Sequence, residues 1–173
     1  MNLPIHPLIR VGISACLLGE KVRHDGNHKY DPDLVKNLGN HFQWVAVCPE
    51  VEMGLGVPRE TMGLVKKSEG VRLVTNHSAI DHTSAFQTYA TTRVAALVKE
   101  NICGFVFKKG SPSCGLKEVP LFNPVGIQTG TGQGLFVSIL LNYLPSLPVA
   151  EAEQLTDLLQ REKFAAQVLA YYN

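Results

Sequence analysis

The chain has 173 residues, of which 45% are hydrophobic and 18% are charged. This size and composition are typical of one globular domain and exclude an intrinsically disordered protein. Sixteen Lys and Arg against fifteen Asp and Glu give a formal net charge of +1, which argues against electrostatically driven binding to long nucleic acids. The chain lacks an apolar run of membrane-helix length, and its first residues lack the pattern of an export signal. We therefore expect a single domain over residues 1–173, cytoplasmic and without a membrane partner.

Short apolar segments alternate with helical patterns along the chain. The apolar segments are rich in β-branched or aromatic residues and lack polar alternation, which is typical of strands covered on both faces. In chain order, the predicted elements are strand Arg10–Ser14, helix Asp31–Leu38, strands Trp44–Val47 and Val71–Val74, helix Thr83–Lys99, strand Gly104–Phe107, and helices Leu135–Leu144 and Ala150–Tyr171. This order indicates an α/β domain with a Rossmann-like parallel sheet flanked by helices, followed by a helical C-terminal extension.

Three of the four cysteines come just after a predicted strand. Cys16, Cys48 and Cys114 each follow one, whereas Cys103 precedes its strand. In an open parallel sheet, the loops after the strands gather at the carboxyl edge, where ligands bind. We therefore expect these three thiols to converge, and we expect Cys103 to be a small buried residue at the opposite edge.

Two explanations of the three thiols remain open at this level. A single cysteine after a strand is usually a packed core residue, but three at one edge favour a metal site. Thiolates are soft ligands, which select zinc or an iron–sulfur cluster over hard cations. The number of thiols does not separate these two metals. Three protein ligands leave one coordination position open, as is usual in catalytic sites.

The segments that contain these cysteines resemble a known family. ISACLLGEKVRHDG, VCPEVEMGLGVPRE and KKGSPSCG are similar to the characteristic blocks of the thiouracil desulfurase family (DUF523), and the resemblance extends from about Arg10 to the C-terminal helix. MGLGVPRETMGLV and GQGLFVSILLNYLPSLPV are most similar to a branch that is often fused to a second domain (DUF1722) and acts on 4-thiouridine. The present sequence ends where that second domain would begin.

This resemblance implies a [4Fe–4S] cluster held by Cys16, Cys48 and Cys114, with one iron lacking a protein ligand. Such an iron is a Lewis acid for a thiocarbonyl sulfur. Water then replaces the sulfur, which leaves as hydrogen sulfide without net electron transfer. Glu50 matches the family's catalytic carboxylate and is the expected general acid–base group. We expect Glu52 to face solvent.

Two serines lie beside the third cysteine, in SPSCG. Either hydroxyl is able to hydrogen-bond the ring carbonyl or the tetrahedral oxygen of the reaction. The alternative is that they cap a turn ahead of Cys114. We assign Ser111 a catalytic role and place Ser113 among the substrate-binding residues, in a mainly structural role.

Cationic side chains occur in loops at the same edge of the predicted sheet. Arg23, His24 and Lys108 are expected to bind a substrate phosphate, the alternative being solvated loop charges. We expect the glycine-rich segment Met53–Arg59 to line the pocket.

The sequence thus predicts an iron–sulfur desulfidase that converts thiouracil or 4-thiouridine-type compounds, preferably the monophosphate, to the uracil form. Its expected partner is a small thiolated pyrimidine base or nucleotide and not tRNA, and its expected state is a monomer or weak dimer. The alternative function is a non-enzymatic nucleotide-binding module with a structural or sensing metal site.

Overall fold

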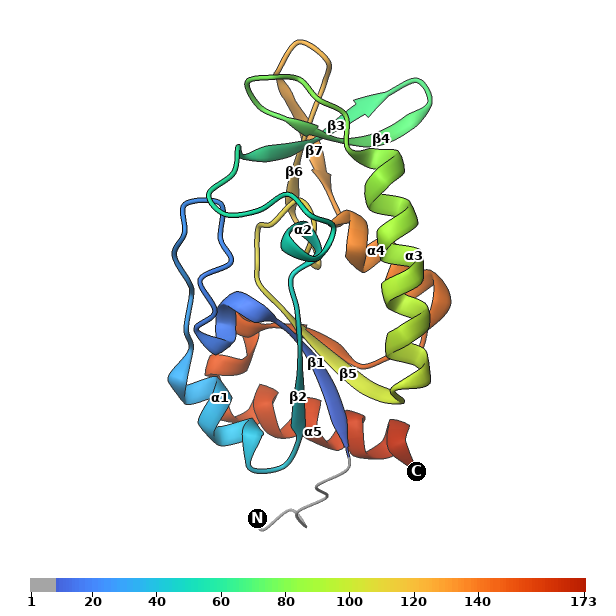
Figure 1. The fold of residues 1–173 in the computed structure, drawn as a ribbon. Coiled ribbons are helices and arrows are strands. Elements are labelled where there is room, and N and C mark those ends of the chain that lie inside the picture. The colour runs from blue at the N-terminus through green and yellow to red at the C-terminus, as the bar shows by residue number, and fades with distance from the viewer. Residues whose placement is uncertain (1–8) are drawn as a thin grey trace.

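A four-stranded parallel sheet lies at the centre of the computed structural model, which describes residues 9–173 (Figure 1). Residues 1–8, which include much of the stretch considered for an export signal, lie outside the described residues. The strands follow the order β2-β1-β5-β8. Their bounds are Arg10–Ser14 for β1, Gln43–Val47 for β2, Ile102–Phe107 for β5 and Val149–Glu151 for β8. Every neighbouring pair in this sheet is parallel, as the sequence predicted.

Helices cover both faces of this sheet. Successive side chains along a buried strand point to opposite faces, so β5 contributes side chains to two different cores. Phe105 and Phe107 of β5 stack with ring centroids 4.2 Å apart. They share a core with α3 (Thr83–Lys99) and α4 (Leu135–Tyr143). Val106 belongs to a second core, which contains side chains of α1 (Pro32–Gly39) and α5 (Leu158–Tyr172). The predicted α/β class, with a parallel sheet between helices, is confirmed.

A second four-stranded sheet, absent from the prediction, stands above the carboxyl edge of the first in Figure 1. Its order is β4-β3-β6-β7, with β3 at Met62–Lys67, β4 at Gly70–Thr75, β6 at Val119–Phe122 and β7 at Gln128–Gly132. The β3–β4 and β6–β7 pairs are antiparallel, and β3 lies parallel to β6. The expectation that Val71–Val74 belongs to the parallel sheet is therefore wrong, because this segment pairs antiparallel with β3 as part of a hairpin.

The C-terminal helix begins later than the sequence predicted. Val149–Glu151 forms strand β8 beside β5, and the 3₁₀ helix η2 (Ala152–Thr156) follows it. The side chain of Asp157 accepts a hydrogen bond from the backbone N–H of Gln160, which caps α5. The predicted helix over Ala150–Tyr171 is thus wrong for its first residues and confirmed from Leu158. Among the described helices, none has both the length and the apolar character needed to cross a membrane.

Candidate active site

A cavity of about 290 Å³ lies at the carboxyl ends of β1, β2 and β5. Loops that are distant in sequence meet there, as the topology of a parallel sheet predicts. The cavity is lined by the residues that the sequence proposed as ligands, catalytic groups or substrate-binding groups, namely Cys16, Arg23, His24, Cys48, Glu50, Lys108, Ser111, Ser113 and Cys114. Of the segment Met53–Arg59, which was also expected to line the pocket, only Arg59 does so. The sheet topology therefore brings the predicted site residues together.

Each of the three candidate ligand cysteines is placed by the end of a strand. Cys16 lies in the 3₁₀ helix η1 (Ala15–Leu18) directly after β1. Cys48 precedes the first residue of α2 (Pro49–Glu52) and follows β2. Cys114 lies in the loop after β5. By contrast, Cys103 is the second residue of β5, at its amino end, and is buried in the core formed with α1 and α5.

Burial determines the protonation of these thiols. Desolvation, with a smaller effect from Cys48, raises the pKa of Cys16 to about 11. Desolvation also raises the pKa of Cys48 and, with contributions from Cys48 and Glu50, that of Cys114. The thiols are therefore neutral at pH 7, and a metal that binds them as thiolates must displace their protons.

Among residues 9–173, the structure contains no group of three or more His, Cys, Asp or Glu side chains arranged to hold a metal ion. The three soft donors nevertheless share one cavity. Thiolates are soft ligands, so this donor set fits an iron–sulfur cluster or zinc and not a hard cation.

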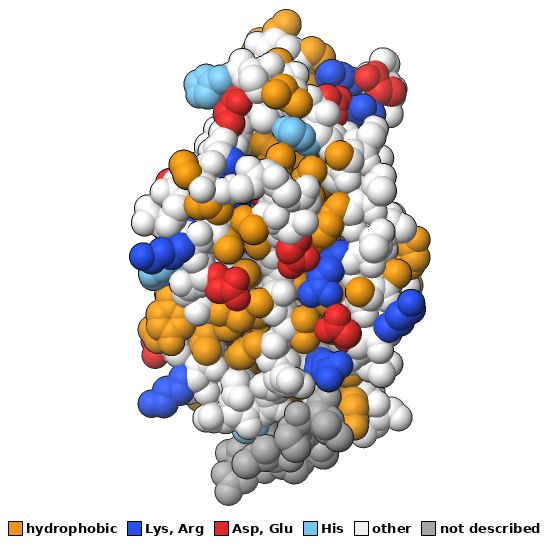
Figure 2. Space-filling view, in the orientation of Figure 1, with side chains coloured by type: hydrophobic (Ala, Val, Ile, Leu, Met, Phe, Trp, Pro, Cys, Tyr) orange, Lys and Arg blue, Asp and Glu red, His pale blue; other side chains and the backbone are white. Residues whose placement is uncertain are grey.

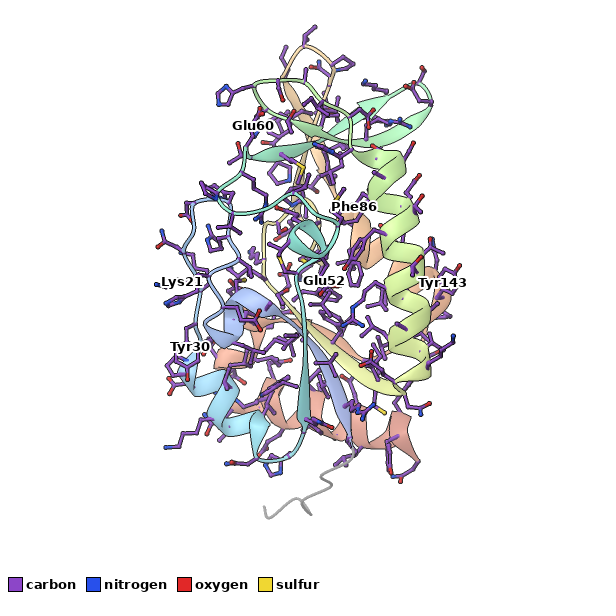
Figure 3. The ribbon with its side chains drawn as sticks, in the orientation of Figure 1. Lys21, Tyr30, Glu52, Glu60, Phe86 and Tyr143 are labelled. Atoms are coloured by element: carbon purple, nitrogen blue, oxygen red, sulfur yellow. The ribbon has the colours of Figure 1, made fainter. Side chains whose placement is uncertain are left out.

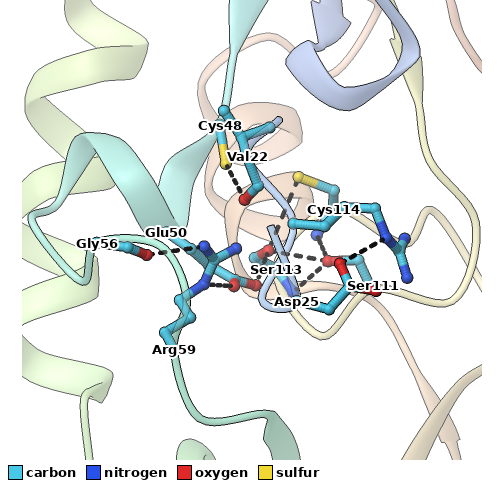
Figure 4. Close-up of polar contacts among 10 residues, drawn as sticks. Val22, Asp25, Cys48, Glu50, Gly56, Arg59, Ser111, Ser113 and Cys114 are labelled. Carbon is cyan, nitrogen blue, oxygen red and sulfur yellow. Dashed lines mark hydrogen bonds and ion pairs between the residues drawn. The ribbon is translucent and has the colours of Figure 1, made fainter. Parts of the chain in front are cut away.

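Both oxygens of the Glu50 carboxylate have a protein partner (Figure 4). Arg59 Nε lies 2.6 Å from Glu50 Oε2, and the Arg59 and Glu50 side chains are only 8% and 12% exposed. Ser113 Oγ donates a hydrogen bond to Glu50 Oε1 at 2.9 Å. The sequence indicated that Arg59 lies at the pocket but not that it pairs with Glu50, because the two residues are separated by a loop whose path has no sequence pattern.

The two serines have different environments. Ser111 Oγ accepts hydrogen bonds from the backbone N–H groups of Ser113 at 3.2 Å and Cys114 at 3.1 Å. This is the turn-capping geometry that the sequence left open as an alternative. Ser113, which is 2% exposed, contacts Glu50 and lies 3.8 Å from Cys114 Sγ. The two hydroxyl oxygens are 2.9 Å apart, so Ser111 reaches Glu50 through Ser113.

The cations around the cavity differ in how firmly they are paired. Lys108 forms an ion pair with Glu153, whereas Arg23 Nε lies 3.9 Å from Asp25 Oδ1 with 27% of its side chain exposed. His24 lines the cavity, and its carbonyl accepts a hydrogen bond from the backbone N–H of Arg59. Figure 2 shows acidic and basic side chains interspersed on the face that it presents, without an extended field of one sign.

Glu52 is exposed, as the sequence suggested, but its carboxylate is also held by protein groups. Its Oε1 accepts a hydrogen bond from the backbone N–H of Cys48 at 3.2 Å, while its Oε2 contacts Tyr89 and Arg93 of α3. Figure 3 labels Glu52 beside α2. Burial, together with the neighbouring Glu52 carboxylate, raises the pKa of Tyr89. One sequence signal for the contact with Cys48 was available, because Glu52 lies in the first helical turn after Cys48. Carboxylates in a first turn often accept hydrogen bonds from backbone N–H groups that lack a partner within the helix.

The model of the 2-thiouracil desulfurase family matches residues 11–152. The chain belongs to this family. Membership confirms the predicted family and identifies the chain as a desulfidase enzyme, against the alternative of a non-enzymatic binding module. The matched region contains the three cysteine-bearing loops and, apart from Arg10 of β1, both sheets.

A solved structure supports the same assignment. It is described as a [4Fe-4S]-dependent thiouracil desulfidase, TudS, and is 28% identical to this chain. The match covers 90% of this chain and 98% of the other, with a TM-score of 0.69. No sequence among the curated proteins matches significantly.

Proposed function

We propose that this chain is an iron–sulfur-dependent desulfidase that converts a thiolated pyrimidine to its carbonyl form and releases hydrogen sulfide. The observation that carries the proposal is the presence of three cysteine thiols and the Glu50 carboxylate on the wall of one cavity. Membership of the 2-thiouracil desulfurase family supports the substrate class. The [4Fe-4S] dependence stated for the similar structure supports the cofactor.

Cys16, Cys48 and Cys114 would hold a [4Fe–4S] cluster, leaving one iron without a protein ligand. When bound, the cluster supplies a Lewis acid for the thiocarbonyl sulfur, which makes the adjacent ring carbon more electrophilic. Cys103 takes no part, because it lies at the opposite end of β5.

The proposed reaction needs a proton acceptor and donor, and we assign this role to Glu50, which lines the same cavity as the three cysteines. It takes a proton from the attacking water and returns one to the departing sulfur. The balance is thiocarbonyl plus water giving carbonyl plus hydrogen sulfide, so no electrons are gained or lost. Ser111 remains our second catalytic candidate, its hydroxyl contacting the oxygen that develops charge, while Ser113 holds Glu50 and borders the substrate.

For the preferred substrate we propose a 4-thiouridine-type monophosphate. Arg23 and His24 line the cavity and are available to a phosphate, and Lys108 adds a second cation if it exchanges Glu153 for the ligand. A mononucleotide needs only such a local clamp, whereas tRNA needs several backbone contacts. We propose a small-molecule substrate and not tRNA, and a monomer or weak dimer as the functional unit.

The test is sulfide release by anaerobically purified protein. We expect a brown protein that contains iron and acid-labile sulfide and that releases sulfide from a panel of 2-thiouracil, 4-thiouracil, 4-thiouridine and its monophosphate. Glu50→Gln should retain the cluster and lose turnover by about 10²- to 10⁴-fold, the usual contribution of a general acid–base group. A protein with a full cluster that releases sulfide from none of these compounds would contradict the proposal.

A further inference from the structure

Arg59 differs from the other cations at the cavity in pairing with Glu50, the proposed acid–base group. Its Nε lies 2.6 Å from Glu50 Oε2, and its Nη1 donates a hydrogen bond to the carbonyl of Gly56 at 3.0 Å. Its backbone N–H donates to the carbonyl of His24 at 2.9 Å. Arg59 is thereby anchored to its own loop, to the loop after β1 and to the start of α2.

This arrangement restricts the Glu50 carboxylate. With Arg59 on Oε2 and Ser113 on Oε1, rotation of the carboxylate breaks contacts on both sides at once. Both side chains of the Arg59–Glu50 pair are largely buried. In such surroundings the loss of one partner leaves the other charge uncompensated, so the remaining side chain is expected to reorient.

We infer that Arg59 is a positioning residue, which holds the Glu50 carboxylate in the orientation that its acid–base role requires. The inference rests on the proposed function. A catalytic group must be held close to its productive geometry, and a displacement of about 1 Å costs on the order of 10²-fold in rate. Because Nε and Nη1 already contact protein groups, Arg59 acts through Glu50 and is not primarily a clamp for the substrate.

The closing experiment compares Arg59→Met and Arg59→Lys with wild type. Methionine keeps much of the side-chain volume and removes the charge, whereas lysine keeps the charge. The matched control is Arg72→Met, because Arg72 Nε forms a comparable pair with Asp81 Oδ2 at 2.8 Å on β4, outside the cavity lining. Iron content, thermal unfolding, kcat and KM are measured for each protein.

For Arg59→Met we expect kcat to fall by about 10- to 100-fold, with KM changed by less than about threefold because substrate binding is retained. Iron content should equal that of wild type, and Arg59→Lys should recover most of the lost kcat. Arg72→Met should leave kcat, KM and iron content unchanged. An unchanged kcat in Arg59→Met, or a rise in KM alone, would overturn the inference.

A double-mutant cycle separates positioning from an independent effect. If Arg59 acts through Glu50, adding Arg59→Met to Glu50→Gln should cause no further loss of kcat. Additive losses would overturn the inference while leaving the proposed function intact. A wild-type protein with a full cluster and no sulfide release would overturn both the inference and the proposed function. If Arg59→Met fails to fold, the comparison of Arg59→Lys with wild type decides. A lower kcat at unchanged KM then supports positioning, and a raised KM at unchanged kcat contradicts it.

Discussion

The phenol of Tyr89 on α3 donates a hydrogen bond of 2.6 Å to the Glu52 carboxylate on α2. The other oxygen of this carboxylate accepts the backbone N–H of Cys48. A side chain of α3 is thereby linked, through one carboxylate, to the backbone of a proposed cluster ligand. Arg93 extends the link along α3, since it contacts Glu52 at 3.1 Å and Glu100 at 3.1 Å.

Removing the Tyr89 hydroxyl should loosen the turn that carries Cys48 and Glu50. For Tyr89→Phe we expect the free energy of unfolding of the metal-free protein to fall by about 1.5–3 kcal/mol, the usual range for a hydrogen bond to a charged group. The holoenzyme should lose iron to a chelator faster than wild type. Urea unfolding and the rate of iron release measure the two effects. Tyr143→Phe, at an exposed position on α4, is the control, and equal iron release in all three proteins would exclude a role for this link.

Cysteine substitutions test the ligand set. Cys16→Ser, Cys48→Ser and Cys114→Ser should each lose most of the iron and sulfide, because each removes one thiolate from a site with three. Cys103→Ser should retain the wild-type content, since Cys103 lies at the amino end of β5 and away from the cavity. Iron and acid-labile sulfide per chain are the readout. Full cluster loss in Cys103→Ser, with normal folding, would contradict this assignment.

The sequence predicted β1, β2 and β5 of the central sheet because these strands are short apolar runs, but it assigned most of β8 to a helix. Thr83–Lys99 was likewise predicted with the bounds that α3 has. The second sheet was missed because β6 and β7 lack such a pattern. β7 reads QTGTG and is mostly exposed, and β6 contains a proline, both of which weaken the signal of a strand. An apolar run such as Val71–Val74 also carries no information about which strand it pairs with.

The site was predictable to the extent that it depends on strand ends. A cysteine after a strand of a parallel sheet must lie at the carboxyl edge, and this rule brought three distant loops together correctly. The contacts of Glu50 and Glu52 were not predictable in the same way. They depend on where the loop that ends at Arg59 returns and on which face of α3 turns toward α2, and both are decided by tertiary packing.

Asp81 gives the protein a specific sensitivity to acid. Its Oδ1 accepts the backbone N–H of Thr83 at the start of α3, and its Oδ2 pairs with Arg72. Burial alone raises the pKa of Asp81, but the hydrogen bonds from Thr83 and Arg72 outweigh this effect and lower it to about 2.

The folded state of the protein therefore favours ionised Asp81 more than the unfolded state does. The resulting stabilisation is present above the ordinary pKa of 3.8 and is lost as the pH falls from there toward 2. We expect metal-free wild type to be more stable than Asp81→Asn at pH 7, by about 1 kcal/mol after allowance for solvent screening. The difference should vanish near pH 2, as urea unfolding at a series of pH values would measure. A difference that is independent of pH would show that the carboxylate charge is not its source.

Among the cavity cations that form an ion pair, Arg23 has the longest distance to its carboxylate partner. Its Nε lies 3.9 Å from Asp25 Oδ1. Asp25 is already satisfied by Asn27, whose side-chain and backbone N–H groups donate to it at 3.1 and 3.0 Å and lower its pKa. Transfer of the Arg23 guanidinium to a phosphate therefore leaves Asp25 with its hydrogen bonds intact.

If Arg23 binds the phosphate of a nucleotide substrate, its loss should affect only substrates that carry one. For Arg23→Ala we expect kcat/KM on 4-thiouridine monophosphate to fall by about 10- to 100-fold, corresponding to one charge-assisted hydrogen bond. The value on 4-thiouracil should change by less than about twofold, because the base itself does not reach this side chain in the proposed arrangement. Raising the salt concentration should reduce the difference between the two substrates, since an exposed guanidinium is screened. Lys36→Ala, an exposed substitution on α1, controls for the change in net charge and should alter neither value. Equal losses on base and monophosphate would place Arg23 in the fold or the chemistry, and an unchanged monophosphate rate would remove it from the phosphate site.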